Sequence, residues 1–447
     1  MKTVNLNILI ILVLMIFTGC TSELDINPKN AISQDALNTS TLTQVRTGMY
    51  SKMEDIMYNS YFDFDMRGEN LQAGPGFSLT DPLSMATSDP VVLSIWRNLY
   101  KGIANVNFLI ASVDNFGSSS AIYQPYKGEA LFFRALLYYN LVTRWGGVPI
   151  VLTNTFDVIQ RSSEAEVWNQ IKSDLIASRN LVSPFSNKFY VSDQAVKALM
   201  ARVYLATGDY TNAALYADSV IISTKFSLST DANSYSTIFI PATSSKEVIF
   251  GLANNTSNNL HLMYSPCNDT KATYTYSPAL LQYNNLYSNS TSPIIKSGDV
   301  RKTAVFTSDK SRCIKYSNGK AGQQLVSVST PNYDPIVLFR LSEMYLIKAE
   351  ALGAANGAST LNAFLSKRYT TVPSVIGISV LNSTDYQNLI LDECRREFYL
   401  EGHWWYDVKR TNRTDLFTTL AGRNYLLYYP IPQAEKDITG YTQNDGY

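Results

Sequence analysis

The segment 192–221, SDQAVKALMARVYLATGDYTNAALYADSVI, constrains the fold of this chain more than any other. Alanines such as Ala198 and Ala213 recur at helical spacing on both sides of a turn at 208–210. Small side chains let two antiparallel helices approach closely, but such a pair leaves its outer face uncovered and needs neighbouring helices. The segment therefore predicts a layered, mainly α-helical fold.

This helix pair, with Gly and Tyr at the bend, resembles a tetratricopeptide repeat. A second pair is predicted at 342–368, with Gly357 near the bend. The wide gap between the two pairs predicts interrupted repeats rather than a regular array. Another helix is predicted after Ser162 or Ser163, because Glu166 can complete a capping box with Ser163.

Two regions lack helical periodicity, at 58–90 and from about 224 to 334. Both are rich in Ser, Asn and Gly, so we expect loops, short strands and a few helical turns packed on the helical scaffold. Loops on a rigid scaffold concentrate binding residues. Aromatic rings that can stack on a ligand, and polar groups that can bond hydroxyls, make the candidate ligand contacts Tyr61, Phe62, Arg67, Asn70, Tyr264, Tyr274, Tyr276 and Tyr283. Ordinary packing or surface roles are the alternative for each of them.

Composition narrows the class of ligand. Lys and Arg number 37, Asp and Glu also number 37, and this balance argues against a nucleic-acid partner. Charged residues make up only 17% of the chain, whereas Tyr occurs 30 times. Such a surface suits neutral polar ligands such as sugars or peptides. The alternative is that the composition reflects only the source organism.

The first twenty residues, MKTVNLNILIILVLMIFTGC, indicate export. Lys2 precedes an apolar run at 8–17 that is too short for a membrane span but has the length of a signal peptide. Its end resembles a bacterial lipobox, which predicts acylation of Cys20 and membrane anchoring without a span. Glu23 and Asp25 follow Cys20 and resemble a surface-export signal. An ordinary signal peptide with a coincidental cysteine is the alternative.

The remaining cysteines, Cys267, Cys313 and Cys394, show neither a metal-binding spacing nor a disulfide framework. A Cys267–Cys313 disulfide is left open by the sequence. The chain has 2 histidines, too few for a histidine-rich metal site. We predict no cofactor and no metal, although scattered Asp residues leave calcium open.

The stretch 395–410, RREFYLEGHWWYDVKR, has the composition of an active site and also of a buried polar seam. Helical spacing places Asp392 and Glu393 beside Arg396, and carboxylates held by cations stay ionised rather than acting as general acids. No nucleophile elbow, P-loop or zinc-protease motif occurs. We therefore predict structural roles, not catalysis, for Arg340, Glu343, Arg396, Glu397, Trp404 and Trp405. A glycan hydrolase is the disfavoured alternative.

Several motifs in order resemble the SusD/RagB family of outer-membrane nutrient-binding lipoproteins. They include WRNLYKGIANVN at 96–107, RREFYLEGHWWYDVKR at 395–410 and YYPIPQAEKDITGYTQNDGY at 428–447. The resemblance implies an α-helical platform of about four irregular tetratricopeptide-like helix pairs with an irregular ligand-facing excursion. It also implies a non-enzymatic lid on a SusC-like TonB-dependent transporter, capturing oligosaccharides or, as in the RagB branch, peptides.

This resemblance gives the predicted organisation of the chain. We expect a lipoprotein signal peptide at 1–19, a helical part at 20–223, the ligand-facing excursion at 224–333 and a final helical part at 334–447. Residues 20–447 are expected to form one compact unit, anchored through acylated Cys20 to outer-membrane lipid and exposed at the cell surface. The chain is short for the family, which suggests trimmed loops on the ligand face.

Overall fold

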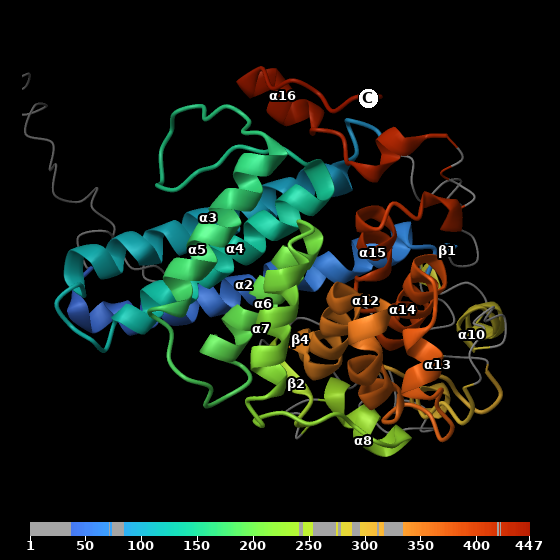
Figure 1. The fold of residues 1–447 in the computed structure, drawn as a ribbon. Coiled ribbons are helices and arrows are strands. Elements are labelled where there is room, and N and C mark those ends of the chain that lie inside the picture. The colour runs from blue at the N-terminus through green and yellow to red at the C-terminus, as the bar shows by residue number, and fades with distance from the viewer. Residues whose placement is uncertain are drawn as a thin grey trace, which may run out of the picture.

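Long helices packed side by side form most of the protein, with short strands and turns at one side (Figure 1). The structure is a computed structural model. It describes residues 37–70, 72–73, 85–240, 245–253, 274–275, 279–287, 296–310, 313–316, 334–417, 420 and 422–447. This arrangement confirms the mainly α-helical fold expected from the alanine-rich pair.

The helical platform follows chain order. Each helix packs against its neighbours in sequence from α2 to α7, and α12 then packs on α7 and α14. The longer helices are α2 (Leu42–Arg67), α3 (Pro90–Phe116), α4 (Gln124–Trp145), α5 (Glu164–Arg179), α6 (Asp193–Ala206), α7 (Tyr210–Ile221), α12 (Leu341–Leu365) and α14 (Ser383–Glu397). No helix in the described part of the chain combines the length and apolarity that a bilayer span requires.

Local sequence signals explain where these helices begin. Ser163 caps α5, and Glu166 accepts hydrogen bonds from the backbone N–H of Ser163 at 2.7 Å and from its hydroxyl at 2.7 Å. This is the predicted capping box, with Ser163 rather than Ser162 as the cap. Asp209 likewise caps α7 by accepting from the backbone N–H of Asn212 at 3.1 Å. The predicted α6–α7 pair is therefore confirmed.

The second predicted helix pair lies within α12, but its bend is at Gly353 instead of Gly357. Gly353 has φ 69° and ψ 175°, which separates two helical halves. Only glycine adopts this backbone conformation readily. Gly357 serves close packing instead, because a Cβ there would lie 2.3 Å from the Ala349 carbonyl oxygen and 2.6 Å from the Tyr386 hydroxyl.

A buried two-stranded sheet ties the irregular region to the platform. β2 (Val248–Leu252) pairs antiparallel with β4 (Ile336–Arg340), with Val248 opposite Arg340 and Leu252 opposite Ile336. Both strands are buried along their whole length. The segment predicted as a ligand-facing excursion at 224–333 therefore contributes one strand to the core.

The smaller elements fill the ends and the remaining side of the molecule. They are η3 (Thr39–Thr41), β1 (Gln72–Ala73), α8 (Ala232–Ser236), η4 (Thr237–Phe239), β3 (Tyr274–Thr275), α10 (Ala279–Tyr287), α11 (Arg301–Val305), α13 (Val375–Ser379), α15 (Trp404–Arg410), η5 (Thr414–Leu416), η6 (Asn424–Leu427) and α16 (Gln433–Thr439). One large apolar core runs through the platform helices, β2, β4 and α15, and a smaller core lies between α12, α13 and α14.

Candidate ligand-binding face and its buried support

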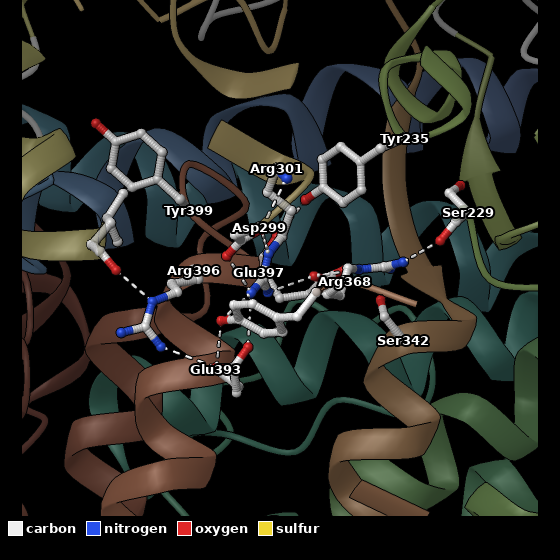
Figure 2. Close-up of polar contacts among 12 residues, drawn as sticks. Ser229, Tyr235, Asp299, Arg301, Ser342, Arg368, Glu393, Arg396, Glu397 and Tyr399 are labelled. Carbon is white, nitrogen blue, oxygen red and sulfur yellow. Dashed lines mark hydrogen bonds and ion pairs between the residues drawn. The ribbon is translucent and has the colours of Figure 1, made fainter. Parts of the chain in front are cut away.

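The end of α14 carries a buried carboxylate, Glu397, that faces arginines from other elements (Figure 2). Oε2 accepts from Arg301 of α11 at 3.0 Å and from Nε of Arg368 at 2.9 Å. Oε1 accepts from Arg368 at 2.7 Å and also from Arg340 at the end of β4. Glu397 thus joins α11, β4 and the segment after α12 to α14.

Glu393, one turn earlier on α14, is held in the same way. Its carboxylate accepts from Lys296 at 2.6 Å, from Arg301 at 2.8 Å, from Arg396 at 3.0 Å and from the Tyr369 hydroxyl at 2.7 Å. The Arg396 contact and a second one from Arg396 to Asp392 at 3.1 Å are the pairs expected from helical spacing.

Electrostatics make both carboxylates poor proton donors. Burial alone would raise the pKa of the Glu397 carboxyl, but the charges of Arg368 and Arg340 outweigh burial and hold this pKa well below its ordinary value. Lys296 and Arg301 lower the pKa of Glu393 in the same manner against the effect of burial. A general acid requires a raised pKa, so this network suits structural support rather than proton transfer.

Most partners in the network come from distant segments, which helical spacing did not reveal. Arg340 donates to Glu247 at 2.9 Å, and Nε of Arg340 donates to Glu401 at 2.9 Å. Lys315 donates to Glu401 at 2.5 Å. Members of the network that were not predicted from the sequence include Glu247, Arg301, Lys315 and Arg368. The signal for Glu247 was available, because this charge directly precedes the apolar strand VIFGL.

The tryptophans and Glu343 also lie inside the protein. Trp404 and Trp405 of α15 are buried and pack against Phe417 with ring centroids 6.1 and 5.4 Å away. Glu343 of α12 accepts from Nε of Arg202 of α6 at 2.6 Å. Arg340 ends β4 and immediately precedes α12.

A small cavity beside this network does not provide a catalytic cleft for a glycan. It measures ≈ 80 Å³ and is lined by residues that include His403, Asp407 and Arg410. Burial raises the pKa of Asp407 to about 6, and burial together with nearby arginines holds the pKa of His403 well below its ordinary value. Pockets for small molecules are usually about 300–1,000 Å³, so this one has room for waters rather than sugar rings.

Two candidate ligand contacts, Arg67 and Asn70, are buried instead of lying on a ligand-facing surface. The Arg67 guanidinium donates to the Leu426 carbonyl and lies 4.6 Å from the Trp405 ring centroid. Asn70 donates through Nδ2 to Asp65 at 2.8 Å. This corrects the expectation for both residues: they fix the end of α2 and the start of the loop that follows it.

The segments 58–90 and 224–334 meet in a short strand pair, although 58–67 belongs to helix α2 and not to a loop as predicted. β1 pairs antiparallel with β3, with Gln72 opposite Thr275 and Ala73 opposite Tyr274. The loop after α2 and the middle of the second irregular region are thereby joined, although they are about two hundred residues apart in sequence. We call this junction, together with α10, the ligand face.

Tyr283 on α10 is the candidate contact whose side chain the structure describes at this face. Its half-buried ring lies 5.7 Å from the Phe306 ring and 5.3 Å from the Tyr287 ring, and Lys310 Nζ lies 4.6 Å from its centroid. α10 is anchored to the network, because Nε of Arg396 donates to the Leu286 carbonyl. The ring is thus held on a supported helix.

The other sequence-predicted residues are located only in part. Tyr61 and Phe62 lie in α2 and Tyr274 in β3, but their side chains are outside the described part of the chain. Cys20, Tyr264, Tyr276 and Cys267 lie outside the described residues altogether. Cys313, the suggested partner of Cys267, is buried, as is Cys394.

Comparison with known proteins decides the family. A family described as "Starch-binding associating with outer membrane" matches residues 24–205, and the "SusD family" matches residues 262–424. The chain belongs to the SusD/RagB family. The motifs that run in order along the sequence are therefore those of SusD-like proteins, and the family's description associates it with the outer membrane.

A curated relative and solved structures align over nearly the full length of this SusD/RagB-family chain, and a second curated relative aligns over part of it. SusD-like protein P38 of Formosa agariphila is 23% identical over 92% of this chain and 92% of its own length. The starch-binding protein SusD of Bacteroides thetaiotaomicron is 32% identical over 30% of this chain and 25% of its own length. A SusD superfamily crystal structure from Bacteroides thetaiotaomicron superposes with TM-score 0.75 at 23% identity, covering 91% of this chain and 99% of that one. A laminarin-binding SusD-like protein superposes with TM-score 0.67 at 20% identity, covering 92% of this chain and 100% of that one.

Proposed function

We propose that this SusD/RagB-family protein is a lipid-anchored, surface-exposed binding protein of the outer membrane. In this role it captures oligosaccharides and passes them to a SusC-like TonB-dependent transporter for import, without catalysing a reaction on them. The observation that carries the proposal is the β1–β3 pair, which joins the segment after α2 to a strand that precedes α10 in chain order. The relatives named for starch and for laminarin support saccharides as the ligand class.

The ion pairs of the buried network also support a binding role. The carboxylates at the end of α14 are committed to arginine and lysine partners, so they stabilise the scaffold that carries the ligand face. Aromatic side chains there can stack on the apolar faces of sugar rings. We propose Tyr283 as one such contact, together with Tyr61, Phe62, Tyr264, Tyr274 and Tyr276 from the segments 58–90 and 224–334.

Binding calorimetry of the full chain in detergent tests the ligand class, using maltoheptaose, laminarihexaose and a panel of peptides. We expect binding of at least one of the saccharides. Loss of an anchoring aromatic side chain costs about 2 kcal/mol, so Tyr283→Ala should weaken binding roughly thirtyfold, whereas Tyr283→Phe keeps the ring and should bind normally. Binding of peptides but not saccharides would assign the same role to peptides. Release of new reducing ends from a bound saccharide would overturn the non-enzymatic role.

The transporter partnership requires its own experiment. Affinity purification of the tagged full chain from its native membranes should recover a TonB-dependent barrel in stoichiometric amount. Tyr283→Ala should leave this recovery unchanged, because the residue is proposed to contact saccharide. Purification of the chain alone under conditions that keep other outer-membrane complexes intact would contradict the partnership.

A further inference from the structure

A second groove lies near the C-terminal end of the chain, beside η6 and the end of α4. In Figure 1 the end marked C is at the top of the view, and α10 lies lower, at the right edge. The volume of the groove is ≈ 370 Å³, within the range of about 300–1,000 Å³ that is usual for ligand pockets. We call it the tyrosine groove. Its lining residues come from the end of α4, the start of α5, η6 and the segment 443–445: Trp145, Gly146, Gly147, Glu164, Asn424, Tyr425, Tyr428, Gln443, Asn444 and Asp445.

Tyr425 provides an aromatic platform at this groove. The residue is 38% exposed, and the Tyr447 ring packs edge-on against the Tyr425 ring with centroids 5.3 Å apart and an interplanar angle of 81°. The intervening Gly446 has φ 91°, and a Cβ on it would lie 2.4 Å from Cγ of Tyr425. The segment can therefore lie against the Tyr425 ring only because glycine occupies position 446.

Hydrogen bonds hold the walls of the groove in place. Asn444 donates through Nδ2 to the carbonyls of Trp145 at 3.0 Å and Tyr429 at 2.8 Å, and its Oδ1 accepts from Arg161 at 2.7 Å. The Tyr428 hydroxyl donates to Glu164 at 2.9 Å. These groups are already paired, so the groove is largely pre-formed and a ligand there would need little rearrangement of the walls.

The rim, in contrast, offers unpaired polar groups. The side chains of Asn424 and Asp445 are exposed and form no hydrogen bond with any residue in the described ranges. An amide can both donate to and accept from a hydroxyl, and a carboxylate can accept from two neighbouring hydroxyls. Together with the Tyr425 ring, they match a sugar, which has an apolar face and hydroxyls at its edge.

The charged residues that line the groove favour a neutral saccharide over an anionic one. Glu164 and Asp445 line the groove, and no Lys or Arg is among the described residues that line it. Nearby cations are engaged in the walls, because Arg161 donates to Asn444 and Lys409 Nζ lies 3.5 Å from the Tyr428 ring centroid. A carboxylated or sulfated saccharide would therefore meet the two lining carboxylates directly. A neutral saccharide has no such penalty.

We propose that the tyrosine groove is a second saccharide-binding site, for one or two rings of a neutral saccharide, with Tyr425 as the stacking platform and Asn424 and Asp445 as hydroxyl-binding groups. The site goes beyond the proposed function, because it needs neither the β1–β3 pair nor α10. It would give the protein a second point of contact with a long glycan or with a separate glycan chain. Two contacts on one ligand raise the overall affinity through effective concentration.

Hydrogen–deuterium exchange of the full chain in detergent tests the site, with maltoheptaose and laminarihexaose as separate probes. We expect at least one probe, at ten times its dissociation constant, to slow exchange by about tenfold at 424–428 and 443–447. Tyr425→Ala should abolish this protection and leave protection at 279–287 unchanged. Tyr210→Ala is the matched control, because Tyr210 is a 54% exposed tyrosine at the start of α7, which packs on α6 and α12, and none of these helices lines the groove.

Other outcomes separate this site from the proposed function. Saccharide protection at 279–287 without any at 424–428 overturns the second site and leaves the proposed function standing. Protection at 424–428 that persists in Tyr283→Ala supports the second site even if the ligand face fails. Protection of the groove by peptides and by neither saccharide overturns the site. Gly446→Ala, which displaces Tyr425 while keeping its ring, should also remove the protection, and unchanged protection in a folded Gly446→Ala protein contradicts the platform role.

Discussion

At the scale of single residues, Glu397 is the carboxylate of the buried network that three arginines share. It is 0% exposed and contacts Arg301, Arg340 and Arg368. Glu397→Gln leaves these buried guanidinium groups without their shared charge, which typically costs about 3–5 kcal/mol. We expect the free energy of unfolding to fall by this amount in urea denaturation, with ligand specificity unchanged in the protein that remains folded.

Asp392→Asn is the matched control for Glu397→Gln. Asp392 lies on the same helix and also pairs with an arginine, but its side chain is 38% exposed. Solvent screens such a pair, so its loss should cost about 0–1 kcal/mol. Equal losses for both variants would show that burial does not set the strength of this network. A Glu397→Gln protein that unfolds normally but loses binding would instead place Glu397 in the ligand site.

The buried carboxyl of Asp65 predicts that the stability of the folded protein falls as pH rises. Burial raises the pKa of this carboxyl to about 7, although Asn70 Nδ2 at 2.8 Å and the Gly402 N–H at 2.7 Å donate to it. An unfolded Asp titrates near pKa ~3.9. The folded state therefore binds this proton more tightly, and its contribution to stability is complete below pH ~3.9 and is lost as pH rises to about 7.

Comparison of wild type with Asp65→Asn isolates that contribution. Asn cannot lose a proton, so stability of the variant relative to wild type should improve steadily between pH 4 and pH 7. Each pH unit within this window is worth up to about 1.4 kcal/mol for a single proton. Urea denaturation at intervals of half a pH unit measures the difference. Parallel stability curves for the two proteins would exclude Asp65 as the titrating group.

At the scale of elements, the two glycines of α12 allow the stability cost of backbone strain to be compared with the stability cost of steric overlap. At Gly353, with φ 69° and ψ 175°, an added Cβ meets no atom within 4 Å, so Gly353→Ala should cost only the conformational strain, about 1–3 kcal/mol. Gly357→Ala should cost more despite a gain of about 1 kcal/mol in helix propensity, because the Ala349 carbonyl oxygen blocks the methyl group. Thermal unfolding of both variants tests this order, and the reverse order would place the bend elsewhere.

Helices were predictable because their signals are local. The capping residues Ser163 and Glu166 and the turn before α7 lie within a few residues of each other. The β1–β3 pair has only two residues in each strand, too few for a periodic pattern. The network at Glu397 was predicted as helical i,i+3 and i,i+4 pairs, yet Arg301 and Arg340 are 96 and 57 residues away in sequence. Such contacts depend on tertiary packing, which a single sequence does not encode in any local spacing.

At the scale of the whole molecule, one set of elements provides a rigid frame, and another set carries the proposed ligand face and the tyrosine groove. Platform helices and the buried ion network provide rigidity, since the network joins α11, α12, α14 and the β2–β4 sheet. The proposed binding groups lie on short elements held by this frame. Arg67 and Asn70 illustrate the division, because both belong to a loop-bearing region by sequence but to the core by burial.

The proposed membrane attachment is a property of the whole molecule that a single residue should control. Each methylene of an acyl chain buried in lipid contributes about 0.8 kcal/mol, and no helix in the described part of the chain has the length and apolarity to replace such an anchor. Cys20→Ala should therefore move the protein from the membrane fraction to the soluble fraction. Saccharide affinity of the released protein should equal that of wild type, because the ligand face and the tyrosine groove are built from residues well after Cys20. Cell fractionation followed by calorimetry measures both quantities.

The matched control for this change is Cys394→Ala. Cys394 is buried in α14 and packs in the smaller core, so its replacement removes a thiol without touching the proposed anchor. This variant should stay in the membrane fraction and lose only a modest part of its stability, since alanine fills most of the same space. A Cys20→Ala protein that resists extraction by high salt and alkaline carbonate would refute the lipid anchor. Loss of saccharide binding on Cys20→Ala in a folded, soluble protein would show that the start of the chain takes part in the ligand site itself.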